Sequence, residues 1–208
     1  ENKVNEINTI GKQIQTLNNQ ILEIEVGGTE TANDLRDQRN RLLDELSTLA
    51  NITYKTDLEG NITVKLEGEP FVTAQDVYEI GIFTDDATGF HTPFWKQNAT
   101  YTVNSAGDRI YDITNAKVFD MTKTISTELD SDVGGLKATV LARGDRRANY
   151  TDLLNKDIYD KDISQSIVMN VQAEFDQLVH GVVTKVNEIL ADASDYTTGY
   201  LCNEDGSP

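Results

Sequence analysis

The chain has 208 residues, of which 38% are hydrophobic and 25% charged, values typical of globular proteins with buried cores. Its 35 acidic and 18 basic residues give a formal net charge of −17. Such a surface repels phosphate groups, so we expect neither nucleic acid nor a membrane as a partner. No apolar run approaches the roughly 20 residues that span a bilayer. The first residues also lack the basic and apolar regions of a secretory signal peptide.

Composition and motifs give no support to catalysis. The single cysteine, Cys202, excludes an internal disulfide framework and a cysteine-rich zinc site. Neither His91 nor His180 has a second ligand at metal spacing, and the sequence contains no phosphate-binding loop or nucleophile elbow. We therefore expect no enzyme activity, no metal and no cofactor. The absence of an initiator Met leads us to expect a piece of a longer chain.

The N-terminal segment predicts a long helix over about residues 3–25. Its apolar residues recur every three or four positions, close to the 3.5-residue repeat of helices that pack along a narrow seam. They are Val4, Ile7, Ile10, Ile14, Leu17, Ile21 and Ile24. Gly27 and Gly28 then predict the end of this helix.

A second helix is predicted to begin near Thr31. Thr31 and Asp34 match a capping box, in which a hydroxyl and a carboxylate bind free backbone N–H groups. The helix should bury a stripe of leucines, namely Leu35, Leu42, Leu43, Leu46 and Leu49. The short loop between the two helices predicts an antiparallel hairpin.

After residue 50 the apolar period changes from about 3.5 to 2. This change predicts a β-hairpin with strands over 52–58 and 62–66, followed by a short strand at 71–72. Residues 73–131 contain short β-like runs between turn signals, at 77–83, 99–104, 109–114 and 117–122. We expect a small inserted β-rich region there, with His91 and Pro93 in a loop.

The C-terminal part predicts one more long helix, over about 162–192. Its apolar face repeats at three and four residues and consists of Val168, Val171, Phe175, Leu178 and Val182, extended by Ile163, Ile167, Val186 and Ile189. Because each long helix needs an apolar partner, the predicted fold is α+β. It is an elongated bundle built from both ends of the chain, 1–72 and 132–208, with a β-hairpin and the β-rich region 73–131 inserted.

Two segments carry a resemblance to a known family. Residues 33–47, NDLRDQRNRLLDELS, follow a helix containing LNNQI and a glycine break. Residues 133–145, VGGLKATVLARGD, precede the last helix. Together with Val186 and Asn187 near the end of the last predicted helix, they resemble the flagellar hook-associated protein 1 family. The matching positions are Asn33, Asp34, Leu35, Asp37, Gln38, Arg39, Leu42, Leu43, Leu46, Gly134, Gly135 and Asn187. The chain departs from the family pattern after Asn187, where a histidine is missing, and 73–131 do not align.

The resemblance implies a structural subunit of the bacterial flagellum, in the junction between hook and filament. It implies type III export without a cleaved signal peptide and an extracellular location. The implied partners are copies of the chain in a ring, the hook protein and the second junction protein. An export chaperone would bind a terminal segment outside this chain.

Two questions remain open at this stage. The charges of Asp37 and Arg39 could be ordinary solvated helix charges. Alternatively, Gln38 and Arg39 could hold the hairpin to the last helix or to a neighbouring subunit.

A different function, that of an adhesin or glycan-binding module, would use residues 73–131 and an aromatic platform of Phe90, Phe94, Trp95 and Tyr101. We favour these aromatic residues as the core of a small β domain.

Overall fold

The computed structural model describes residues 1–26, 31–86, 88–120, 126, 128, 131 and 133–193. The predicted helix break at Gly27 and Gly28, the end of the run 117–122 and Cys202 lie outside these residues. The described chain divides into two compact units, Glu1–Val140 and Leu141–Pro208. Each unit is described by itself. The prediction of one discontinuous bundle from 1–72 and 132–208 therefore stays a prediction.

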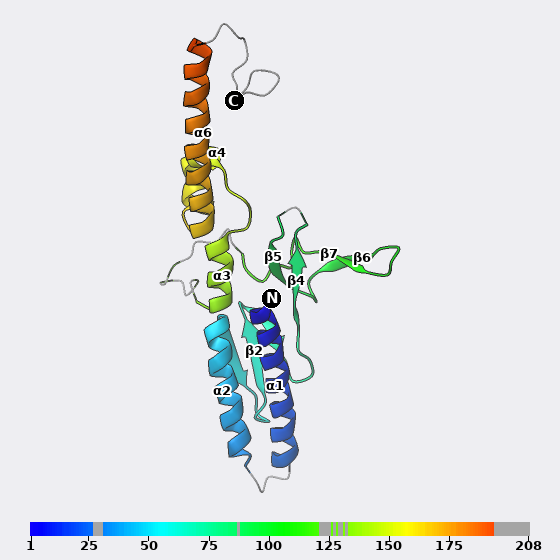
Figure 1. The fold of residues 1–208 in the computed structure, drawn as a ribbon. Helices are drawn as coiled ribbons and strands as arrows, with labels where there is room; N and C mark the ends of the chain where they lie inside the picture. Colours follow the sequence, from blue (N-terminus) through cyan, green and yellow to red (C-terminus); the bar gives the residue numbers. More distant parts are fainter. Residues whose placement is uncertain are drawn as a thin grey trace. The chain divides into compact units, whose positions relative to one another are not determined.

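The first unit begins with a helical hairpin, as the apolar periodicity predicts. Helix α1 (Asn2–Glu25) and helix α2 (Asn33–Leu49) lie side by side and antiparallel in Figure 1. Helix α1 buries the predicted seam from Val4 to Ile21, whereas Ile24 is exposed. In helix α2 Leu43, Leu46 and Leu49 are buried, but Leu35 and Leu42 are only half-buried.

The predicted capping box of helix α2 is wrong. The N-cap residue is Ala32, and no side chain of the helix caps its N-terminus. Instead, the backbone N–H of Ala32 donates to Oε1 of Glu25 at 2.9 Å. The same carboxylate pairs with the guanidinium of Arg36, at 2.9 Å from its Nε. The end of helix α1 therefore caps the start of helix α2, which is a tertiary interaction that no local sequence motif reveals.

A three-stranded antiparallel sheet packs against the two helices. Strands β1 (Ile52–Thr56) and β2 (Ile62–Leu66) form the predicted hairpin, and β3 (Glu69–Val72) adds to β2 in the order β1-β2-β3. Strand β2 alternates buried and more exposed residues, as a half-buried strand should. Its apolar side chains enter the main core together with helices α1 and α2.

The region 73–131 forms two further antiparallel hairpins. Strand β4 (Ile80–Thr84) pairs with β5 (His91–Trp95), and β6 (Thr100–Val103) pairs with β7 (Arg109–Asp112). The expectation of a loop at His91 and Pro93 is wrong, because both lie in β5. The run 117–122 forms no strand within 117–120, where Lys117 only makes an isolated bridge to Phe94.

This β-rich region shares the core of the helical hairpin. Ile80, Trp95, Val118 and Phe119 belong to the same buried cluster as the apolar side chains of α1, α2 and β2. Phe94 is buried in a second small cluster with Ile113 and Ala116. Phe94 and Trp95 therefore serve as core, as we favoured, whereas Phe90 is half-buried and Tyr101 is exposed.

The second unit contains the predicted long C-terminal helix, which begins at Ile167 and not near residue 162 as predicted. Helix α6 spans Ile167–Ala193, and a π-helical segment, Tyr159–Ile163, precedes it. Helix α3 (Gly135–Arg143) crosses the division between the units. Two short helices, α4 (Tyr150–Leu154) and α5 (Lys156–Ile158), complete the described part of the second unit.

Helix α4 is fixed to one face of helix α6 by polar contacts at every fourth residue. Oε1 of Gln172 accepts from the backbone N–H of Ala148 at 3.3 Å, and Oδ2 of Asp176 accepts from that of Tyr150 at 3.0 Å. One turn further along, the imidazole of His180 stacks on the Tyr150 ring with 4.1 Å between centroids. The small apolar core of this unit, including Met169 and Ala173, lies on the same side of α6.

Candidate functional site

The first candidate site is the polar network around Arg39, inside the signature segment 33–47. The side chain of Arg39 is only 2% exposed. Its Nη1 donates to Oδ1 of Asn18 on helix α1 at 2.7 Å and to the carbonyl of Gly60 at 2.9 Å. Burial lowers the pKa of Arg39, yet a guanidinium stays charged in proteins. The alternative of an ordinary solvated charge is therefore wrong for Arg39.

Asn18 connects this network to the sheet. Its Nδ2 donates to the carbonyl of Ile62 at 2.8 Å, and its Oδ1 accepts from the backbone N–H of Ile62 at 3.1 Å. Strand β3 pairs with β2 only from Val64 onward. Beside Ile62, the side-chain amide of Asn18 therefore makes the backbone hydrogen bonds that a neighbouring strand would make. Arg39 joins helix α2, helix α1 and the turn between β1 and β2, all within the first unit. Its described partners do not include helix α6.

The remaining signature residues have different surroundings. Asn33, Asp34, Asp37 and Gln38 are exposed on helix α2. Gly134 has a φ of +102°, and a Cβ atom there would lie 2.7 Å from the Cα of Ala50. Both the positive φ and the lack of room for a Cβ atom therefore require glycine at position 134. A Cβ atom at Gly135 would lie 3.3 Å from the carbonyl oxygen of Thr48. Asn187 is buried on helix α6.

The second candidate site is an exposed apolar face on helix α6, which we call the α6 stripe. It consists of Val168, Val171, Phe175, Leu178 and Val182. Phe175 is 65% exposed and Leu178 is 63% exposed. The contacts to helix α4 and the small core use other faces of α6. Contiguous exposed apolar residues of this kind mark an interaction surface, and their heptad spacing suits another helix.

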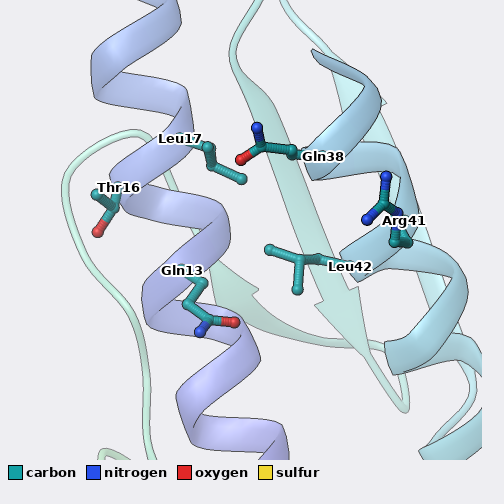
Figure 2. A pocket seen from close by; sticks show the side chains of 6 residues that line it. All are labelled: Gln13, Thr16, Leu17, Gln38, Arg41 and Leu42. Carbon is teal, nitrogen blue, oxygen red and sulfur yellow. The ribbon is translucent and has the colours of Figure 1, made fainter. Parts of the chain in front are cut away.

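The third candidate is a groove between helices α1 and α2, which we call the α1–α2 groove. Figure 2 shows Leu17 and Gln38 pointing toward each other across it, with Leu42 directed toward helix α1. The groove has a volume of about 420 Å³ and is lined by Gln13, Thr16, Leu17, Gln38, Arg41 and Leu42. Its floor is apolar, while amide groups and one guanidinium form its rim.

The described residues were also compared with two further kinds of site, a metal centre and a membrane-spanning helix. Within the described part of the chain, no group of three His, Cys, Asp or Glu side chains could hold a metal ion. Among the same residues, no helix has the length and apolar character needed to cross a membrane. The proposed aromatic platform is also not formed, because Phe94 is 2% and Trp95 1% exposed.

The described part of the chain is an α+β fold with an exposed apolar face on helix α6. The family described as flagellar hook-associated protein FlgK helical domain matches residues 1–201. The chain therefore belongs to this family, whose role is that of a hook-associated structural protein of the bacterial flagellum.

The other comparisons provide weaker evidence on the family of this chain. The flagellar hook junction protein FlgK from Burkholderia pseudomallei, a solved structure, is 28% identical with a TM-score of 0.39. The similarity covers 46% of this chain, which spans only 16% of that protein. No curated protein matches the chain.

Proposed function

We propose that the chain is the helical part of a subunit that forms the junction between hook and filament. In this role it holds copies of itself in a ring and contacts the hook protein on one side and the second junction protein on the other. It acts by binding and not by catalysis. It reaches the cell exterior through the flagellar export apparatus without a cleaved signal peptide, and a chaperone binds a terminal segment outside this chain.

The observation that carries this proposal, beside family membership, is the α6 stripe. A folded subunit that keeps five large apolar side chains on one helix face in contact with water loses hydrophobic stabilisation, at roughly 25 cal/mol per Å². Assembly recovers that stabilisation by covering the face. A stripe at heptad spacing is matched best by a helix, which is the element that a tubular assembly of helical subunits supplies.

The test is to replace Phe175 and Leu178 by Glu in the full-length protein in its native host. We expect normal amounts of exported, folded protein but no stable junction, so that filaments are shed and swimming is lost. Gln177→Glu is the matched control, because Gln177 is exposed on the same turn outside the stripe. Full motility of the Phe175 and Leu178 variant would contradict the proposal.

A further inference from the structure

The N-terminal half of helix α3 is docked onto the first unit. Leu136 is buried in the main core, and Val140 packs against that core. Gly134, just before the helix, lies so close to Ala50 that no Cβ atom fits between them. Helix α3 continues across the division between the two units. Its docking therefore decides whether the chain leaves the first unit from a fixed point.

One ion pair in this contact is almost out of reach of water. The ammonium of Lys137 on α3 lies 3.8 Å from Oε2 of Glu67, in the turn between β2 and β3. The side chains of Lys137 and Glu67 are 11% and 12% exposed. A separation of 3.8 Å is too long for a hydrogen bond. The pair therefore gains Coulomb attraction without a hydrogen bond, while both groups lose most of their hydration.

The Glu67 carboxyl has little other support. Its Oε1 accepts from the backbone N–H of Asn51 at 3.2 Å, which is its one hydrogen bond to a described residue. The charged side chains beside the turn, Lys65 on β2 and Glu69 on β3, are exposed. Lys3 of helix α1 places its Nζ beside the first residue of α3. No described group thus replaces the water that an ionised Glu67 loses.

The turn itself does not explain why a glutamate stands at this position. Glu67 and Gly68 both have positive φ, +51° and +89°. Among the described residues, Glu67 is the one non-glycine residue in this region of backbone conformation. Two-residue hairpin turns of this kind favour Asn, Asp or Gly at the first position. The surrounding structure therefore holds Glu67 in a backbone conformation that is unfavourable for it, a feature that recurs in switch regions.

Two other paired carboxylates of the first unit show the contrast with Glu67. Glu25 accepts hydrogen bonds from Arg36 and from the N–H of Ala32, and these lower its pKa to about 2. Hydrogen bonds from two lysines lower the pKa of Glu79 to about 2 in the same way. Burial instead raises the pKa of Glu67, and this effect outweighs the lowering by the Asn51 N–H and the Lys137 ammonium.

We propose that Glu67 and Lys137 form a pH-sensitive latch, which holds the start of helix α3 on the first unit while Glu67 is protonated and loosens when Glu67 ionises. The neutral carboxyl still accepts from Asn51, and the long Lys137 side chain can then turn its ammonium toward water. The latch requires no partner and goes beyond the proposed function. Proteins of the flagellum lie outside the cell, so the pH of the surroundings acts on this contact directly.

The direction of the pH effect follows from linkage. Below the ordinary pKa of 4.5, Glu67 is protonated whether α3 is docked or not, and the docking is at its strongest. As the pH rises, the undocked state loses its proton first, because only the docked state raises the pKa. Docking therefore weakens as the pH rises through the pKa of the docked state, which is the opposite of the effect of Glu79.

Hydrogen exchange of the full-length, unassembled protein between about pH 4 and pH 7 tests the latch, with rates corrected for the intrinsic effect of pH. In the unmodified protein we expect the protection of the amides from Ala138 to Val140 to fall severalfold as the pH rises. Glu67→Gln keeps an acceptor for Asn51 and cannot ionise, so its protection should stay constant and exceed that of the unmodified protein at pH 7. Glu69→Gln is the matched control, because Glu69 is exposed beside the same turn and its replacement changes the net charge equally. It should behave as the unmodified protein does.

A second variant, Lys137→Met, keeps the apolar stem and removes the ammonium. Ionisation of Glu67 is then compensated less, so we expect a larger loss of α3 protection between pH 4 and pH 7 than in the unmodified protein. A smaller loss in Lys137→Met would overturn the inference, even if Glu67→Gln failed to fold. The same pH dependence in Glu67→Gln and the unmodified protein would also overturn it. So would weaker protection of α3 in Glu67→Gln at pH 7, because the ionised pair would then hold the helix.

Discussion

At the scale of single residues, Arg39 shows how one buried charge can organise a fold. A guanidinium out of contact with water is costly unless its donors are bonded. Here Asn18 and Gly60 both accept from its Nη1, at 2.7 and 2.9 Å, while its buried Nε has no hydrogen-bond partner among the described residues. The neighbouring Arg36 instead bonds Glu25 near the surface, and Arg41 has no such partner among the described residues. Three arginines on one helix therefore have three different energetic roles.

We predict that Arg39→Ala destabilises the protein by about 2–4 kcal/mol, because it leaves buried acceptors unpaired. Arg36→Ala should cost about 1 kcal/mol, as expected for a partly exposed pair. Arg41→Ala should change stability by less than about 0.5 kcal/mol. Urea unfolding of the three variants measures this order. Equal unfolding midpoints would remove any special role of Arg39.

Glu79 makes the stability of the folded protein depend on pH in the acidic range. Its carboxylate contacts the ammonium groups of Lys12 and Lys96, each at 2.5 Å. The hydrogen bonds from Lys12 and Lys96 lower the pKa of Glu79 from 4.5 to about 2. A carboxyl whose pKa is lower in the folded state stabilises that state at neutral pH. This contribution decreases as the pH falls from about 4.5 through 2.

We therefore expect Glu79→Gln to be less stable than the unmodified protein at pH 7, with the difference disappearing near pH 2. Urea unfolding across this pH range provides the measurement. Glu45→Gln serves as a control, because Glu45 is exposed on helix α2 and forms no ion pair with a described residue. A stability difference that stays constant with pH would contradict the assigned role of Glu79.

At the scale of elements, helix α1 holds the β structure at two places by the same device. Asn18 bonds both backbone groups of Ile62, and Asn8 does the same for Ile80, donating at 2.9 Å and accepting at 3.0 Å. The helix can approach the sheet because Gly11 lies over Phe71. A Cβ atom at Gly11 would come within 2.5 Å of the Phe71 ring.

This contact makes a helix glycine essential where helix propensity alone would favour alanine. We predict that Gly11→Ala destabilises the protein by about 1–3 kcal/mol, because Phe71 is fully buried and cannot move away. Gly181→Ala in helix α6 should instead stabilise by up to about 1 kcal/mol, since its Cβ would meet nothing within 4 Å. The urea unfolding midpoints of both variants measure this difference in stability. An unchanged midpoint for Gly11→Ala would contradict the prediction.

The sequence predicts those elements whose signals are local. Apolar periodicity places helices α1, α2 and α6, and the change of period places β1 and β2. Strand β5 was missed because His91 and Pro93 are typical of loops, although Pro93 needs no donor in a two-stranded ribbon. The contacts of Arg39 with Asn18, and of Glu25 with Ala32, join residues 21 and 7 positions apart. They depend on the helix-to-helix approach, which no local pattern encodes.

At the scale of the whole molecule, buried apolar surface is distributed unevenly. Helix α1 buries six large apolar side chains, from Val4 to Ile21, and four of them, Val4, Ile7, Ile10 and Ile14, belong to the main core. Helix α6 buries Met169 and Ala173 in a small cluster and leaves the α6 stripe in water. Local opening is easiest where few apolar contacts are lost. Within the described residues, helix α6 is therefore the element that gains most from a partner.

Hydrogen exchange of the isolated chain should show this difference. We expect amides in the middle of helix α6, from Val171 to Val182, to exchange faster than those from Ile7 to Leu17 in helix α1. In the assembled protein the α6 amides should slow markedly, because opening then also breaks contacts with the neighbour, while α1 amides facing the core should change little. Mass spectrometry of both states gives the measurement. Equal protection of the two helices in the isolated chain would mean that the α6 stripe is already covered.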